Sequence, residues 1–275
     1  MFRVAGWVVA GFAGIAALDA LYRVFPGIGP GEFASTCIKY AILYGCVAFP
    51  ARRHFGFSWA DLVPTRGVAA WLLVPILVAS LGGVVLGYQA NAFFQAVMVV
   101  PANSAQSAGP RVAHSMLHEL VATSLLPGIA EEAIFRGLVL TALLATPMSQ
   151  RRAIVVSGLL FAAVHFDLWN FPGALLGGLL YGWMFVRTRS LLPSMLAHAF
   201  HNGLLVLLSR LDSLPKSLFE HIVHDADGFL PAWLVWIGAA LSAIGLVAFR
   251  MALRMKDQAA RARREPSCER LDMAA

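Results

Sequence analysis

Charged residues are scarce in this chain. Asp, Glu, Lys and Arg make up 13% of its 275 residues, whereas 59% are apolar and the mean hydropathy is +0.71. A water-soluble domain of this size is not expected to have such a composition. Several apolar runs approach the ~20 residues that a helix needs to cross a bilayer. We therefore predict an all-α, polytopic membrane protein, because an outer-membrane barrel would instead show alternating segments of ~10 residues.

Cysteine is also rare, and we find no internal repeat. The three cysteines, Cys37, Cys46 and Cys268, show no CxxC spacing, so we predict neither a disulfide framework nor a cysteine-based metal site. The net charge of +6 arises from cations in short loops and in the C-terminal stretch. That distribution follows the positive-inside rule of membrane proteins. We therefore expect the lipid bilayer as a partner and no nucleic acid.

We predict about eight transmembrane helices in a single membrane domain at 1–253, followed by a basic cytoplasmic tail at 254–275. An even number of spans places both termini on one side. The short arginine-containing loops fall on that same side, which is cytoplasmic by the positive-inside rule. We expect a bacterial inner-membrane protein whose motif-bearing core covers about 112–210. The predicted spans are near residues 4–21, 35–49, 68–88, 112–147, 153–166, 171–186, 191–208 and 229–253.

Two adjacent carboxylates and an arginine interrupt the fourth apolar segment. An ionisable group at mid-membrane costs on the order of 3 kcal/mol, so such groups are candidates for function. Glu132 and Arg136 are four residues apart and can pair on one helix face. Glu131 lies about 100° away on the helix, which leaves it as the reactive carboxylate. A salt-bridge network that only holds helices together is the alternative interpretation.

Two further spans carry polar groups with a spacing of four residues. Phe161 and His165 share one helix face, and so do His198 and Asn202. His201 lies partly on the face of His198. Polar side chains in hydrocarbon must find partners on other helices. From their positions along the spans, we expect Glu131, His165 and His198 to meet in one cavity below the cytoplasmic surface.

These motifs resemble those of a known family. In chain order they are Glu131-Glu132-x-x-x-Arg136, Phe161-x-x-x-His165 and His198-x-x-x-Asn202. The set is similar to that of the CPBP intramembrane proteases, which include the CAAX prenyl endopeptidases and the bacterial Abi proteins. Each motif alone is weak, but three in order inside apolar spans are specific. The resemblance covers about residues 120–205.

The resemblance implies an eight-helix membrane enzyme that hydrolyses peptide bonds of a membrane-associated peptide. Glu131 would be the general base that activates water, with His165 helping to hold it. His198 and Asn202 would polarise the scissile carbonyl and stabilise the oxyanion, while Glu132 and Arg136, supported by Phe161, would orient the helix. We favour a reaction without a metal. If zinc is used, Glu131, His165 and His198 are its expected ligands.

Two other histidine groups are not assigned to the site. His114 and His118 lack the HExxH order, and His221 and His224 fall in a loop that we expect to be solvated. Two rival functions remain open from the sequence: a transporter with a proton relay, and a non-catalytic membrane binding or immunity protein. The substrate, including whether it is prenylated, and the oligomeric state are left open.

Overall fold

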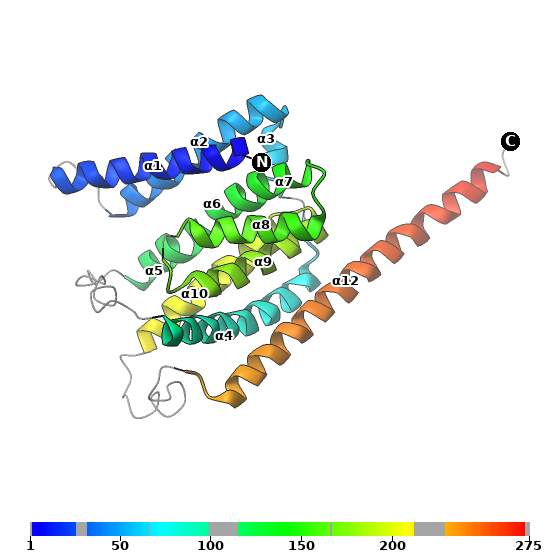
Figure 1. Cartoon of the computed structure of the whole chain (residues 1–275). Coiled ribbons are helices and arrows are strands. Elements are labelled where there is room, and N and C mark those ends of the chain that lie inside the picture. The colour runs from blue at the N-terminus through cyan, green and yellow to red at the C-terminus, as the bar shows by residue number, and fades with distance from the viewer. Residues whose placement is uncertain are drawn as a thin grey trace.

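The computed structural model describes residues 2–25, 32–65, 67–98, 115–165, 167–211 and 229–272, and these form an all-helical bundle (Figure 1). The predicted all-α class is therefore confirmed for the described residues. Residues 99–114 and 212–228, which include His114, His221 and His224, lie outside the described part. The elements are α1 (Phe2–Val24), α2 (Glu32–Phe55), α3 (Trp59–Leu62), η1 (Ala70–Leu72), α4 (Leu73–Val97), α5 (Met116–Glu119), η2 (Leu120–Leu125), α6 (Leu126–Glu132), η3 (Ala133–Leu140), α7 (Thr141–Leu144), α8 (Gln150–Ala163), α9 (Phe171–Thr188), α10 (Leu192–Leu211) and α12 (Ala232–Asp272).

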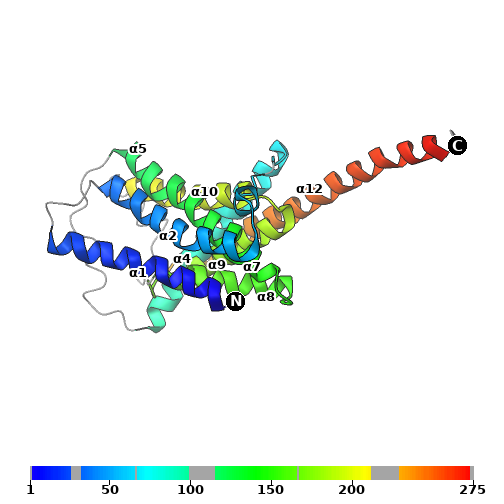
Figure 2. The ribbon, with the colours of Figure 1, turned by 90° about the horizontal axis from the view of Figure 1, so that it is seen from above.

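The first two helices form a hairpin that packs against the centre of the molecule. Helices α1 and α2 run side by side (Figure 2), and Lys39 of α2 forms a 2.6 Å ion pair with Asp19 of α1. On α2, Leu43, Val47 and Ala51 are buried in the hydrophobic core together with residues of η3. The spacing of these three side chains places them on one face of the helix. Through that face, the hairpin packs against the helix that carries the Glu131-Glu132-x-x-x-Arg136 motif.

The fourth predicted span is one continuous helical stretch from Met116 to Leu144 that contains two π-helical segments, η2 and η3. Pro127 stands in the first turn of α6, between them. A π turn changes the hydrogen-bonding pattern of the backbone, and side-chain hydroxyls supply donors at η3. Ser157 donates to the carbonyl of Phe135 and Thr141 donates to that of Arg136. The sequence predicts that the helix kinks or restarts at Pro127-Gly128; the structure shows π-helical segments on both sides of α6.

Two helices continue beyond their predicted ends. Helix α2 extends to Phe55 instead of ending at 49, so that Arg52 and Arg53 lie in its last turn rather than in a loop. Cations at this end of a helix are favoured by its dipole. Helix α4 extends to Val97 instead of ending at 88. Its Gln89 and Asn91 hydrogen-bond to Leu230 and Gly173. Polar residues ended both predicted spans, whereas the helix dipole at the arginines of α2 and the tertiary hydrogen bonds of α4 stabilise the additional turns.

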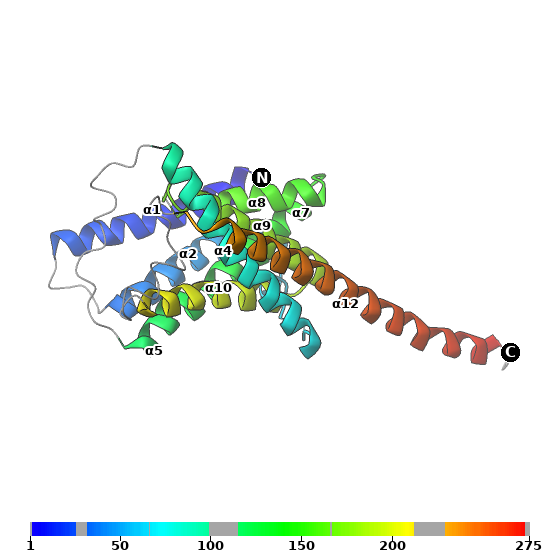
Figure 3. The ribbon, with the colours of Figure 1, turned by 90° about the horizontal axis from the view of Figure 1, so that it is seen from below.

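Helix α12 crosses α4 and then projects beyond the rest of the bundle (Figure 3). The predicted tail from residue 254 continues this helix to Asp272. By length and composition, Ala70–Val97 and Ala232–Lys256 could each cross a membrane, while Gly6–Tyr22 and Leu192–Leu208 are shorter apolar helices. Large apolar side chains on the outer surface of α12, such as Trp236 and Ile244, are exposed. These features support an integral membrane protein.

Candidate active site

The central helix buries an ion pair beside the proposed base. Arg136 Nη1 donates to Glu132 Oε1 at 2.7 Å, and both side chains are 0% exposed. The pairing expected from their spacing is therefore present. Arg136 Nη2 also donates to the carbonyl of Gly178 on α9 at 3.0 Å. The guanidinium lies over the ring of Phe161 at 4.5 Å from the centroid and near that of Tyr181 at 5.3 Å, so it joins η3 to α8 and α9.

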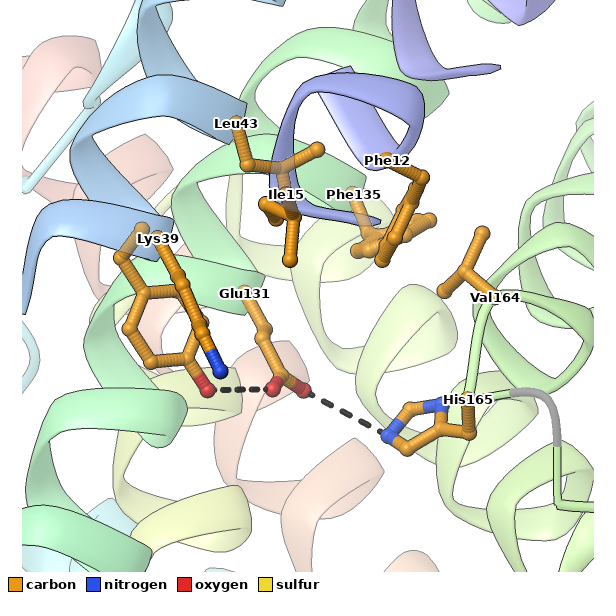
Figure 4. Close-up of a pocket in the computed structure, with 9 residues that line it drawn as sticks. Phe12, Ile15, Lys39, Leu43, Glu131, Phe135, Val164 and His165 are labelled. Atoms are coloured by element: carbon orange, nitrogen blue, oxygen red, sulfur yellow. Dashed lines mark hydrogen bonds and ion pairs between the residues drawn. The ribbon is translucent and has the colours of Figure 1, made fainter. Parts of the chain in front are cut away.

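The two oxygens of the Glu131 carboxylate have different surroundings. Its Oε1 accepts a hydrogen bond from the Tyr40 hydroxyl at 2.7 Å. Its Oε2 is buried and has no hydrogen-bond partner among the described residues. Oε2 lies 3.8 Å from His165 Nε2 and 3.9 Å from His198 Nε2. Figure 4 shows Glu131 directed toward His165. The structure thus brings the acid and two imidazoles together, and leaves one carboxylate oxygen available.

The contacts of Nδ1 in each imidazole indicate which ring nitrogen carries the hydrogen. His165 Nδ1 contacts the carbonyl of Phe161 at 2.7 Å, and His198 Nδ1 contacts Glu132 Oε1 at 2.9 Å. A carbonyl or an ionised carboxylate can only accept, so each Nδ1 carries the hydrogen. In a neutral ring, Nε2 then presents a lone pair. Glu131 Oε2 therefore faces two acceptor nitrogens, at 3.8 and 3.9 Å, an arrangement suited to a bound molecule that donates hydrogen bonds.

Aromatic rings hold the two imidazoles in place. His198 stacks on Tyr181, with centroids 5.1 Å apart and an interplanar angle of 17°. Phe161 packs edge-on against His198 at 5.7 Å and against His165 at 4.9 Å. His165 lies in the turn just after α8, which ends at Ala163, and not inside a helix as predicted. The ring of Phe161 still orients it because the two side chains remain in contact.

The backbone of α10 approaches the central helix closely at Gly128. A Cβ atom there would lie about 3.0 Å from the backbone N of Ala199, which is tighter than ordinary contact. Ser124 Oγ donates to the carbonyl of Ala199 at 2.6 Å and fixes the same crossing. The crossing is one turn before Glu131 and beside His198. This packing explains how α10 brings an imidazole to the carboxylates.

A cavity of about 580 Å³ is lined by all four residues predicted to be catalytic. Glu131, His165, His198 and Asn202 line its wall, and His201 lies there too. A smaller cavity of about 200 Å³ adjoins Glu131 and His165 from the side of α1 and α2. Figure 4 shows its apolar lining, which includes Phe12, Ile15 and Leu43. The acid and His165 therefore stand in the wall between two cavities.

Sequence reasoning missed two residues of the site. Tyr40 contacts Glu131 from α2, and Tyr181 stacks on His198 from α9. Tyr181 lies in the segment between the second and third motifs, and no role was predicted for it. Tyr40 lies outside the motifs, and its only signal is a phenol next to Lys39 in an apolar segment. Such a signal gives no partner, so only the fold reveals the contact.

The donor atoms of Glu131, His165 and His198 are of the types that bind zinc. Carboxylate oxygen and imidazole nitrogen are both zinc ligands, but two ligands of a tetrahedral ion at ~2.1 Å lie roughly 3.4 Å apart. The separations here are 3.8 and 3.9 Å. Within the described residues, no group of three or more His, Cys, Asp or Glu side chains is placed to hold a metal ion. The two separations are therefore wider than those of an ideal tetrahedral zinc site.

The fold and the site together define a helical membrane protein in which a buried acid and two imidazoles face a cavity. Residues 113–204 match the family model of the type II CAAX prenyl endopeptidase Rce1-like proteins. This match confirms the family resemblance predicted from the three motifs, all of which lie in the matched segment. It supports a CAAX-type intramembrane protease in general. No curated protein sequence matches the chain.

Proposed function

We propose that the protein is an intramembrane endopeptidase that hydrolyses a peptide bond in a membrane-associated peptide, prenylated or otherwise processed. The observation that carries this proposal is the convergence of Glu131 Oε2 with two imidazole nitrogens at 3.8 and 3.9 Å. A water molecule placed among them donates one hydrogen to the carboxylate and the other to an imidazole. Such a molecule is both held and activated for attack.

In the proposed reaction, Glu131 removes a proton from this water while the water oxygen forms a bond to the scissile carbonyl carbon. The carbonyl oxygen becomes an oxyanion, which the amide of Asn202 stabilises by donating a hydrogen bond. His198 Nε2 also donates, but only when its ring carries both protons, because Nδ1–H is committed to Glu132. The carbon–nitrogen bond then breaks, and Glu131 returns the proton to the leaving amine. The second proton of the water stays with the product carboxylic acid.

We also propose that this reaction needs no zinc. The support is the donor geometry, whose separations exceed those of a tetrahedral zinc site. The chemistry above uses only the carboxylate, the imidazoles and the amide. Zinc held by Glu131, His165 and His198 is the alternative, and metal analysis with chelator treatment of the purified protein separates the two. Loss of activity on chelation and its return with added zinc would establish the alternative.

We propose that eight spans enclose the cavity inside a bacterial inner membrane, with both termini in the cytoplasm. Residues 1–253 would form one membrane domain, and residues from 254 would extend into the cytoplasm. Helix α12 supports this view because it continues past the bundle after its apolar part (Figure 1). The arginines of the last turn of α2 and of the first turn of α8 supply further positive charge expected on the cytoplasmic side.

Cleavage of membrane-anchored reporter peptides by the purified full-length protein tests the function. Glu131→Gln keeps the shape of the side chain but removes the base, so we expect kcat/KM to fall by about 10³-fold. Glu119→Gln, on the same continuous helix and outside the cavity lining, is the matched control and should retain activity. Equal cleavage by the wild-type protein and Glu131→Gln would contradict Glu131 as the base, whereas absence of cleavage by the wild-type protein would favour a transporter or a non-catalytic binding protein. Peptides with and without a prenyl group define the substrate class.

A further inference from the structure

We propose that Tyr40 is a positioning residue for the general base, and that the α1–α2 hairpin brings it to the site. Tyr40 lies outside residues 113–204, the segment that matches the family model. The inference rests on the proposed function, in which Glu131 activates water. It adds a residue that none of the three motifs includes.

The hydrogen bond from Tyr40 makes the two oxygens of the Glu131 carboxylate different. The phenol donates to Oε1 at 2.7 Å, and this leaves Oε2 toward His165 and His198. The last torsion of a glutamate side chain is broad, so the carboxylate would otherwise rotate. One oxygen held by a phenol fixes that torsion. The other oxygen then faces the place where water must lie for attack.

The backbone of α2 delivers Tyr40 to this place. Leu43, Val47 and Ala51 follow it at three, seven and eleven residues and are 3%, 0% and 1% exposed. These side chains lie on the face that packs against η3 and its neighbours, and Tyr40 continues that face by one turn. The ion pair of Lys39 with Asp19 links the same turn of α2 to α1. The phenol is thus aimed at Glu131 by the packing of the hairpin.

The position of Tyr40 between the cavities agrees with a role at the reacting carboxylate. Tyr40, Glu131 and His165 line both the 580 Å³ cavity and the 200 Å³ cavity. Figure 4 shows Lys39 and Leu43 of the same helix on the hairpin side of Glu131. A residue needed only for packing would not require a hydroxyl at this wall. Phenylalanine would fill the same space and lose only the donated hydrogen bond.

Tyr44 provides a matched control on the same helix. It is one turn beyond Tyr40, packs against the hydrophobic core, and is absent from the linings of both cavities as drawn from the described residues. Tyr44→Phe therefore removes a hydroxyl from α2 without touching the base. Comparison of the two variants separates positioning of Glu131 from a general effect of removing a phenol.

The experiment measures steady-state kinetics and melting temperatures of full-length wild-type protein, Tyr40→Phe, Tyr44→Phe and Glu131→Gln with the reporter peptide. For Tyr40→Phe we expect kcat to fall roughly 10- to 100-fold, as for loss of one hydrogen bond to a charged group. KM should change less than about twofold, because the contact acts on the base and not on substrate binding. Tyr44→Phe should match the wild-type protein, and both tyrosine variants should melt at similar temperatures.

The outcomes distinguish this inference from the proposed function. If Glu131→Gln is inactive while Tyr40→Phe has the wild-type kcat, the positioning role is wrong and the proposed function stands. If Tyr40→Phe and Tyr44→Phe lose kcat equally, or if Tyr40→Phe loses activity only through KM, the positioning role is also wrong. If Glu131→Gln is fully active, Glu131 is not the base, and the role of Tyr40 fails with it.

Discussion

Glu131 and Glu132 are neighbours in sequence but have different partners. Glu132 is fully buried and is held by Arg136 and by His198. Glu131 is 15% exposed and keeps one oxygen directed at two imidazoles. Buried charges persist when paired and hydrogen-bonded. The difference in partners agrees with the proposed roles, in which Glu132 orients the helix and Glu131 acts on water.

The buried ion pair leads to a prediction at the residue scale. Arg136→Met removes the cation and leaves Glu132 buried without it, so we expect a loss of about 3–5 kcal/mol of stability. The measurement is unfolding of the detergent-solubilised protein, by heat or by denaturant. Arg187→Met is the control, because Arg187 is exposed and lies 6.0 Å from the centroid of the Trp183 ring. Equal stabilities of the two variants would show that the buried pair is not a major contribution.

Helices meet at small residues where backbones must approach. Gly128 lets α10 come close to the central helix, and Gly178 faces Gly158 where α9 crosses α8. The carbonyl of Gly178 then reaches Arg136. Small residues allow such contact between helices in lipid, where the hydrophobic effect contributes little to helix association. The arrangement of α8, α9 and α10 around the site therefore depends on positions that carry no side chain.

The crossing of α4 and α12 gives a prediction at the element scale. A Cβ at Gly82 would overlap the carbonyl of Gly238 and lie 2.5 Å from the backbone N of Ser242. Gly82→Ala must therefore separate the helices, and we expect about 1–3 kcal/mol of destabilisation. Gly83→Ala is the adjacent control, because its Cβ would only touch a side-chain carbon of Leu180 at 3.6 Å. Unfolding of both variants in detergent tests this. A stable Gly82→Ala together with a destabilised Gly83→Ala would contradict the packing.

At the scale of the whole molecule, the site is assembled from distant segments of the chain. Tyr40 comes from the first hairpin, Glu131 from the central helix, His165 from the turn after α8, and His198 from α10. The family match covers the last three only. With the proposed role for Tyr40, a complete active site requires the N-terminal hairpin to pack against the matched core, as it does through Leu43 and Val47.

The membrane topology is a prediction at this scale. With eight spans, a compartment-specific reporter fused after Ala275 should lie in the cytoplasm, because an even number of crossings returns the chain to its starting side. A reporter placed in the connection between α4 and α5 should lie on the opposite side, because it follows an odd number of crossings. Activity of reporter enzymes in intact cells measures both. A C-terminal fusion that reports the external side would contradict eight spans with cytoplasmic termini.

The sequence by itself determined the helical class, the pairing of Glu132 with Arg136 and the residues expected at one cavity. These features follow from local apolar runs and from four-residue spacing, which fix neighbours on a single helix. Only the tertiary structure decided that His198 pairs with Glu132, that Tyr40 contacts Glu131, and that α2 and α4 extend beyond their apolar parts. Contacts between helices depend on how their faces pack, and a polar residue ends an apolar run without ending a helix whose side chains find partners elsewhere.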